Sequence, residues 1–261
     1  MNKQFLKSIP TYILVILLSI NNLFGQIARP IKDVDKVALE GIIVEKYYEY
    51  NSSDVLDTLG GCLPKGSVTY RIYVDLKPNY NLQAVYGVNE HELFIKTTTQ
   101  FFNNTNQGQG TGDYIDDKKI MGNTALFDSY LTLGAANKSY FGIPKTDDKD
   151  GSILKLNSFA SADGLMIGKI KPVTYFGVIP TFFNGYNTAN TFYTNNGSWA
   201  MFGGIKGPTE DNKILIAQLT TDGTLSFELN IQIGTPTGAS VNFVAKNPQK
   251  QEIKFEGLTV K

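Results

Sequence analysis

The feature that most constrains this chain is a regular alternation of apolar and polar residues that begins at residue 68. Apolar side chains occupy every second position, at Val68, Tyr70, Ile72, Val74 and Leu76. The side chains between them belong to Thr69, Arg71, Tyr73 and Asp75. A period of two is typical of a β-strand with one face in a core and the other in water. The segment therefore predicts a sheet that must bury its apolar face against a second sheet.

Further strands are predicted on both sides of this one. Residues 37–50 are rich in β-branched and aromatic side chains and predict the first strand. Lys77 to Asn79 form a break, after which 82–86 and 92–98 are predicted as the next neighbours in an antiparallel meander. We find no convincing stretch with helical periodicity.

The C-terminal third carries the second strong alternation. Residues 213–220 lead through Thr221, Asp222 and Gly223 into 224–234, and Asp-Gly between two alternating runs is a hairpin signal. Ile72 and Phe227 are predicted to lie in the core, and 241–245 and 253–260 to form closing strands. The chain is thus predicted to be all-β, as an antiparallel two-sheet β-sandwich of jelly-roll-like form.

The first 25 residues have the pattern of a targeting segment. Lys3 and Lys7 precede an apolar run at 12–20, and the more polar residues 21–25 end in a small residue, Gly25. The apolar run is shorter than the roughly 20 residues that a lasting membrane anchor needs. We therefore expect a signal peptide at 1–25 and a single all-β domain at 26–261. The protein is expected to be exported, to the cell surface, the extracellular space or the periplasm.

Composition narrows the function further. Basic and acidic side chains are equal in number at 24 each, and no Lys or Arg cluster appears, which disfavours nucleic-acid binding.

Cys62 is the only cysteine, so no internal disulfide can form, and we expect a small buried or half-buried side chain beside Gly60 and Gly61. His91 is the only histidine, which excludes a two-histidine zinc site; we expect it at a turn between two strands.

Several segments together resemble a known family. They read LPKGSVTYRIYVDL at 63–76, LQAVYG at 82–87, HELFIKTTTQFFNN at 91–104, ALFDSYLTLGAA at 125–136, and the long run 196–238 from NGSWAMFGG to IGTPTG. This text resembles an uncharacterised secreted domain family of exported Bacteroidota proteins. The resemblance implies an extracellular β-rich module, often carried with a type IX secretion sorting segment, for which we expect no room after Lys261. It implies no catalytic residues.

One loop resembles the first part of a calcium site. Thr146, Asp148 and Asp150 place oxygen atoms at alternate positions, and Gly151 follows them. Calcium takes six to eight oxygen ligands, and a glycine allows a loop to fold around it. The acidic ligand expected near the far end of such a loop is absent, since Asn157 stands there. Calcium is therefore a candidate cofactor here, and an acidic surface turn without metal is the alternative.

The region 180–199 interleaves aromatic and asparagine side chains. Aromatic rings stack on the apolar faces of sugars, and amides exchange hydrogen bonds with hydroxyl groups. The ligand-binding residues predicted on this basis are Phe183, Tyr186, Asn187, Tyr193, Asn196 and Trp199. The alternative is that these rings fill one end of the sandwich while the asparagines occupy turns.

We therefore expect a non-enzymatic module that binds a glycan or a surface protein. A secreted carbohydrate-active enzyme, a jelly-roll lyase or hydrolase, is the first alternative, and a structural or adhesive component is the second. A hydrolase needs two carboxylates across a cleft, and the candidates are Asp75, Glu92, Asp128 and Glu228. A lyase could use Tyr or Lys bases beside Arg71. No spacing in the sequence singles out any of these residues.

Overall fold

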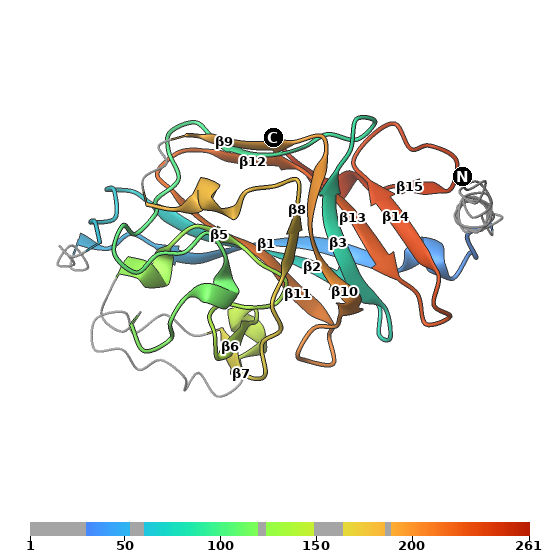
Figure 1. The fold of residues 1–261 in the computed structure, drawn as a ribbon, viewed down its shortest axis with the longest axis horizontal. Coiled ribbons are helices and arrows are strands. Elements are labelled where there is room, and N and C mark those ends of the chain that lie inside the picture. The colour runs from blue at the N-terminus through green and yellow to red at the C-terminus, as the bar shows by residue number, and fades with distance from the viewer. Residues whose placement is uncertain (1–29, 53–59, 120–123, 149–163, 186–188) are drawn as a thin grey trace, which may run out of the picture. The chain divides into compact units, whose positions relative to one another are not determined.

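The protein folds into antiparallel β-sheets joined by turns and short 3₁₀ helices, which confirms the predicted all-β class (Figure 1). The computed structural model describes residues 30–52, 60–119, 124–148, 164–185 and 189–261. The chain divides into two units, Met1–Lys32 and Asp33–Lys261, and the second contains every element given below. The 3₁₀ helices are η1 (Asp35–Val37), η3 (Gly112–Tyr114), η4 (Thr124–Phe127), η5 (Lys145–Asp147), η6 (Pro180–Phe183) and η7 (Glu256–Leu258).

One sheet has the strand order β1-β2-β11-β5 and is called the closed sheet below, because both of its faces are covered. Its strands are β1 (Leu39–Glu49), β2 (Val68–Leu76), β11 (Lys213–Thr221) and β5 (Tyr130–Leu131). The central strand β2 buries Ile72, Val74 and Leu76 on one face, as predicted. It also buries Thr69, Arg71 and Tyr73 on the other. The prediction that this second face meets water is wrong.

The second face of the closed sheet is covered by the segment made of residues 101–119 and 124–143. A hydrophobic cluster joins Tyr47, Tyr73 and Leu215 of the sheet to side chains of that segment, among them Phe102, Leu126, Phe127 and Tyr130. The amide of Gln218 on β11 donates hydrogen bonds to the carbonyl oxygens of Leu126 and Asp128, which fixes the segment to the sheet. The apolar side chains of this segment thus contribute a second core.

The remaining strands form a six-stranded sheet, a four-stranded sheet and a small pair. The first has the order β15 (Glu252–Lys254), β14 (Ser240–Val244), β13 (Asn230–Gly234), β3 (Asn81–Gly87), β10 (Gly197–Ile205) and β8 (Thr174–Phe176). The second has the order β16 (Thr259–Val260), β12 (Leu225–Glu228), β4 (Leu93–Thr97) and β9 (Thr191–Thr194). The pair is β6 (Tyr140–Gly142) with β7 (Leu165–Ile167). Only β14 and β15 pair in parallel among the strands described.

The six-stranded and four-stranded sheets are two arms of one sheet that bends. Three chain segments, β12–β13, β3–β4 and β9–β10, pass from one arm to the other, and they are neighbours in the same order in both. At the bend, the buried amide of Asn230 lies 3.1–3.2 Å from the carbonyl oxygens of Tyr86, His91 and Glu92. Gly87 is required nearby, since a Cβ there would collide with the carbonyl oxygen of Thr194.

Two predictions about strand partners are wrong. The strands 68–76, 82–86 and 92–98 do not form a meander, because β2 lies in the closed sheet while β3 and β4 lie in different arms of the bent sheet. The Asp-Gly turn does not close a hairpin either: β11 pairs with β2 and β5, whereas β12 pairs with β4 and β16. The hydroxyl of Thr221 instead contacts those of Thr97 and Thr99 and accepts the N–H of Gly223. Ile72 and Phe227 are fully buried, as expected.

Candidate functional site

Two of the four aromatic residues predicted to bind a ligand in region 180–199 belong to the core. Phe183 and Trp199 are fully buried, and their rings lie 5.7 Å and 6.2 Å from that of Phe192 between centroids. Phe101 packs edge-on against Phe183 at 5.5 Å. Burial leaves Phe183 and Trp199 no surface on which a ligand could stack. This outcome matches the alternative that the rings fill the sandwich.

The other members of the predicted set do not gather around these rings. Tyr193 on β9 is half exposed, and its hydroxyl donates to a carboxylate oxygen of Glu92 at 2.7 Å. Asn196 is an exposed residue between β9 and β10, and its N–H donates to the hydroxyl of Thr194 at 3.2 Å. Tyr186 and Asn187 lie outside the described residues.

The predicted calcium loop is described only in part, because Asp150 lies outside the described residues. Its beginning has structural contacts: Asp148 accepts the N–H of Gly164 at 2.6 Å, and Asp147 pairs with Lys213 at 2.9 Å. The hydroxyl of Thr146 donates to Asp147 at 3.1 Å. Within the described residues, no group of three or more His, Cys, Asp or Glu side chains is placed to hold a metal ion. Calcium binding by Thr146, Asp148 and Asp150 stays a prediction.

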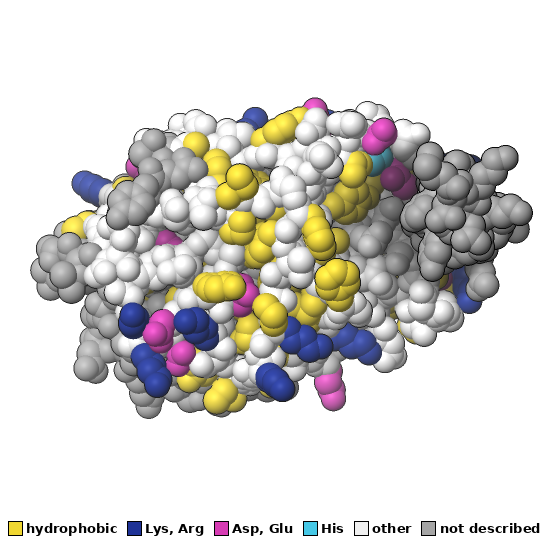
Figure 2. Space-filling view, in the orientation of Figure 1, with side chains coloured by type: hydrophobic (Ala, Val, Ile, Leu, Met, Phe, Trp, Pro, Cys, Tyr) yellow, Lys and Arg dark blue, Asp and Glu magenta, His cyan; other side chains and the backbone are white. Residues whose placement is uncertain are grey.

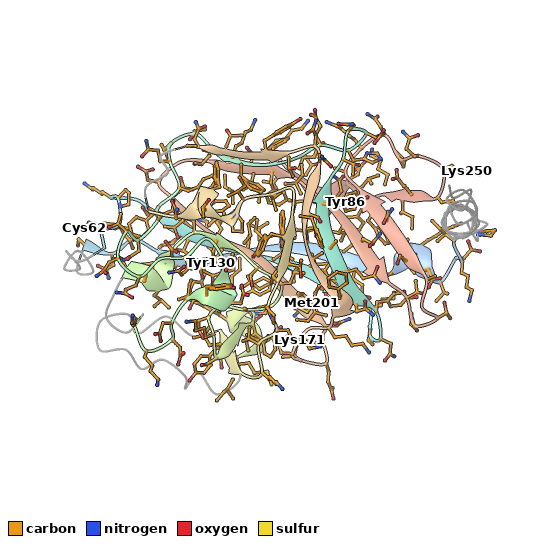
Figure 3. The ribbon with its side chains drawn as sticks, viewed as in Figure 1. Cys62, Tyr86, Tyr130, Lys171, Met201 and Lys250 are labelled. Atoms are coloured by element: carbon orange, nitrogen blue, oxygen red, sulfur yellow. The ribbon has the colours of Figure 1, made fainter. Side chains whose placement is uncertain are left out.

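The single cysteine and the single histidine have different surroundings. Cys62 is exposed, so the expectation of a buried thiol is wrong; it lies at the periphery, far from Met201 (Figure 3). His91 lies at the predicted turn, where it forms a bridge with Val88. Its ring is buried, and Nε2 lies 2.6 Å from a carboxylate oxygen of Glu252. This hydrogen bond could not be predicted from the sequence, because 161 positions separate its members.

The described residues also form a groove on the outer face of the six-stranded sheet. Its floor is a row of cross-strand neighbours, Thr174, Ala200, Ala84 and Gln232, on the adjacent strands β8, β10, β3 and β13. The next row along the strands, Trp199, Val85 and Ile231, is fully buried and faces the core. Side chains alternate between the faces of a strand, so the row with the two alanines faces outward. The groove encloses about 320 Å³.

A β-bulge in β10 lies beside this floor and contains an exposed aromatic residue. Ala200 pairs with Ala84 and Ile205 pairs with Leu82, so β10 carries extra residues between these pairs. Gly203 and Gly204 in the bulge have φ angles of 75° and 72°, in the left-handed region that glycine adopts readily. Phe202 precedes these glycines and faces outward like Ala200, two residues earlier on the strand, while Met201 between them is buried. Phe202 is 84% exposed.

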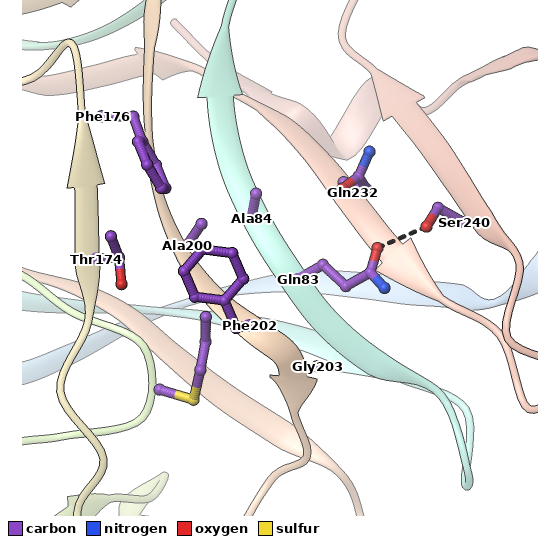
Figure 4. A pocket seen from close by; sticks show the side chains of 10 residues that line it. Gln83, Ala84, Thr174, Phe176, Ala200, Phe202, Gly203, Gln232 and Ser240 are labelled. Carbon is purple, nitrogen blue, oxygen red and sulfur yellow. Dashed lines mark hydrogen bonds between the residues drawn. The ribbon is translucent and has the colours of Figure 1, made fainter. Parts of the chain in front are cut away.

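The two sides of the groove differ in polarity. Phe202 and the half-exposed Phe176 of β8 lie with ring centroids 6.3 Å apart. Figure 2 shows hydrophobic side chains gathered on the face crossed by β8, β10 and β3. Opposite them, the hydroxyl of Ser240 on β14 donates to Oε1 of Gln83 at 2.8 Å, and Gln232 lines the wall between (Figure 4). Among the described residues that line the groove, none is ionisable.

The acidic residues considered for hydrolysis do not meet at this groove. Glu228 pairs with Lys246 at 2.9 Å, and Glu92 accepts the hydroxyl of Tyr193. Asp128 is fully buried and accepts the N–H groups of Asn104 and Gln109, each at 2.7 Å. Burial raises the pKa of the Asp75 carboxyl on β2 in the closed sheet, while Lys213 acts in the opposite direction. Glu228, Glu92 and Asp128 thus each have a protein partner outside the groove, and Asp75 lies in the closed sheet.

The groove was not predicted from the sequence, although the sequence contains one signal for it. Two glycines directly after Phe202, inside an otherwise strand-like run, indicate a bulge. What the sequence could not reveal is that β8, β10, β3 and β13 are neighbours. Comparisons with protein families, curated proteins and solved structures found no match. No helix among the described residues is long and apolar enough to cross a membrane.

Proposed function

We propose that this protein is an exported, non-enzymatic module that binds carbohydrate in the groove of the six-stranded sheet. The observation that carries the proposal is Phe202, an aromatic side chain that is 84% exposed above a floor of two alanines. It lies with the half-exposed Phe176 on the apolar side of the groove. Apolar side chains normally gain stability by burial, so two neighbouring aromatic rings left in water beside a hollow point to a ligand that covers them.

The chemistry of the lining suits a sugar. Phe176 and Phe202 offer ring faces and edges to the apolar C–H face of a pyranose, a contact of the kind that aromatic rings favour. Gln83, Gln232 and Ser240 supply amide and hydroxyl groups, which both donate and accept hydrogen bonds as sugar hydroxyls do. A surface protein is the other ligand class that the sequence left open. It matches the groove less well than a sugar does, because Gln83, Gln232 and Ser240 form a side of neutral hydrogen-bonding groups suited to sugar hydroxyls.

Binding is favoured over catalysis for this groove. Hydrolysis of a glycosidic bond by the usual route requires two carboxyl groups on opposite sides of the scissile bond, and the described lining offers only amides, hydroxyls and apolar groups. Export is supported by the basic start at Lys3 and Lys7 and the apolar run at 12–20. N-terminal sequencing of the protein recovered from the culture medium or the periplasm tests it, and an intact Met1 there contradicts cleavage after Gly25.

Affinity electrophoresis in gels that contain soluble polysaccharides tests the binding. The Phe202→Ala variant is expected to lose retardation, because the stacking surface is gone, while the fold is kept. Tyr114→Ala is the matched control: it also removes an exposed aromatic ring, but from η3, which does not line the groove. Equal loss in both variants, or no retardation of the unmodified protein by any polysaccharide, contradicts the proposed function.

A further inference from the structure

The groove is longer than a single sugar ring. Its lining residues come from five adjacent strands, in the order β8, β10, β3, β13 and β14. Neighbouring strands are about 4.8 Å apart, so four intervals span roughly 19 Å across the sheet. The side chains at the two ends, Phe176 on β8 and Ser240 on β14, are both exposed. A ligand that lies across the strands can therefore extend beyond the groove in either direction.

Polarity changes along this axis. The end formed by β8 and β10 carries Phe176 and Phe202, whose rings are arranged edge to face at an interplanar angle of 89°. The other end carries Gln83, Gln232 and Ser240, and the Ser240 hydroxyl already holds the Gln83 amide in place (Figure 4). Gln232 is fixed similarly, since its Nε2 donates to Asn242 at 3.2 Å. One end thus offers stacking and the other offers oriented hydrogen bonds, which together match successive units of one chain.

Charge restricts the ligand further. A carboxylate or sulfate group that loses its hydration must gain a cationic partner, because burial of an unpaired charge is strongly unfavourable. The described residues that line the groove include no Lys, Arg or His. The neutral lining is therefore complementary to a neutral ligand and unfavourable for a uronate or a sulfated sugar.

Building on the proposed function, we infer that the groove binds the interior of a linear, uncharged polysaccharide whose chain crosses strands β8 to β14. One unit stacks on Phe202 and Phe176, and the following units hydrogen-bond to Gln83, Gln232 and Ser240. The affinity then depends on the number of linked units and not on a free chain end. A groove that recognised one terminal sugar would not need contacts distributed over five strands.

Isothermal titration calorimetry with graded oligosaccharides tests this inference. The probes are the neutral cello-, xylo- and manno-oligosaccharides from mono- to hexasaccharide, with oligomannuronates as charged counterparts. For the neutral series that binds, affinity is expected to rise at least about tenfold from the mono- to the tetrasaccharide, because more lining residues are engaged. Reduction of the terminal unit to the alditol is expected to leave hexasaccharide affinity unchanged. Phe202→Ala is expected to weaken every length about tenfold or more, and Gln232→Ala to weaken the tetrasaccharide more than the monosaccharide.

The outcomes separate the inference from the proposed function. A monosaccharide that binds as tightly as the tetrasaccharide, or affinity abolished by the alditol end, overturns the chain-interior assignment and keeps carbohydrate binding. Tighter binding of oligomannuronates than of every neutral series overturns the assignment of an uncharged ligand. Absence of binding by all series, with the circular dichroism of a folded β protein retained, overturns both. Tyr114→Ala again serves as the control, and its affinity is expected to equal that of the unmodified protein.

Discussion

The closed sheet and the six-stranded sheet use similar strands in opposite ways. Strand β2 buries polar side chains on its second face, and Arg71 there is 1% exposed. Strand β3 also alternates, but on its second face Gln83 and Ala84 stay partly exposed and line a groove. The difference comes from elsewhere in the chain: residues 101–119 and 124–143 cover the closed sheet, whereas the face with the groove has a hollow of about 320 Å³.

The role of a polar residue on a strand of this fold depends on whether other residues cover its face of the sheet. On the closed sheet, polar side chains have protein partners: Arg71 donates to Gln218 at 2.9 Å and to the carbonyl oxygen of Gly164 at 2.9 Å. On the open face, the polar groups are arranged among themselves and still meet solvent, as Gln83 and Ser240 do. Substitutions on the first sheet should therefore affect folding, and those on the second should affect binding.

Among substitutions of polar residues, the largest expected effect is that of Arg71→Met. This change removes the donors to Gln218 and Gly164 and the cation that lies 3.5 Å from the centre of the Tyr47 ring. Two buried acceptors are left without partners, at about 1–3 kcal/mol each. We expect the free energy of unfolding to fall by about 3 kcal/mol, measured by urea denaturation. Lys96→Met is the matched control, because Lys96 lies over the Phe94 ring at the surface, and its effect should stay below about 0.5 kcal/mol.

The two variants decide whether the closed sheet is a structural region. Equal urea midpoints for Arg71→Met and Lys96→Met would mean that the buried guanidinium contributes nothing to stability, and the distinction between the sheets would be lost. The urea midpoint of Arg71→Lys should lie between those of Arg71→Met and the unmodified protein. Lysine keeps the charge but lacks the planar arrangement of donors that reaches two acceptors at once.

Asp128→Asn comes next in expected size. Burial raises the pKa of the Asp128 carboxyl well above its usual range, although the N–H groups of Asn104 and Gln109 act in the opposite direction. The variant places an amide NH₂ group against one of these N–H donors, which should lower the free energy of unfolding by about 1–3 kcal/mol near pH 4. Urea denaturation of both proteins at several pH values measures the gap.

The sign of the pH dependence follows from the raised pKa. The folded protein keeps the Asp128 proton to a higher pH than the unfolded chain, in which the pKa is about 3.9. Stability from this group is therefore complete below about pH 4 and is lost as the pH rises through the folded-state pKa. Asparagine does not titrate, so the difference in free energy of unfolding between the unmodified protein and Asp128→Asn should narrow as the pH rises. A gap that widens from pH 4 to about pH 7 would contradict the raised pKa.

The bulge of the open sheet offers a smaller, matched pair of substitutions. Gly203→Ala and Gly204→Ala both force alanine into the left-handed region, at about 1–2 kcal/mol each. An added Cβ at Gly203 meets open space, whereas one at Gly204 collides with the Asn81 side-chain oxygen. Asn81 has little room to move, because its oxygen also lies against Gly234. Thermal unfolding should show about 1 kcal/mol more destabilisation for Gly204→Ala. Equal melting temperatures would show that the bulge is not packed as described.

The sequence allowed part of this structure to be predicted. Local alternation located β1, β2, β3, β4 and β11 and the buried positions of Ile72 and Phe227, because burial and extended geometry act residue by residue. Strand partners could not be predicted, since the bend at Asn230 and Gly87 depends on contacts between distant segments. Trp199 shows the limit for the site. Composition marks it as a ligand-binding residue, but its position on the inner face of β10 was decided by pairing with Val85.

The smallest expected effect on stability is that of Phe202→Ala, and it tests the comparison most directly. Phe202 is 84% exposed, so little apolar surface returns to water when the ring is removed, and the free energy of unfolding should change by less than about 0.5 kcal/mol. Phe192→Ala on β9 is the matched comparison, since that ring is 4% exposed and packs among other aromatic rings; about 3–5 kcal/mol should be lost. A large loss of stability in Phe202→Ala would mean that the ring supports the fold, and its exposure could then no longer be attributed to a ligand. If Phe202→Ala keeps the urea midpoint of the unmodified protein but is no longer retarded by polysaccharide, then the Phe202 ring serves binding and not the folding of the six-stranded sheet.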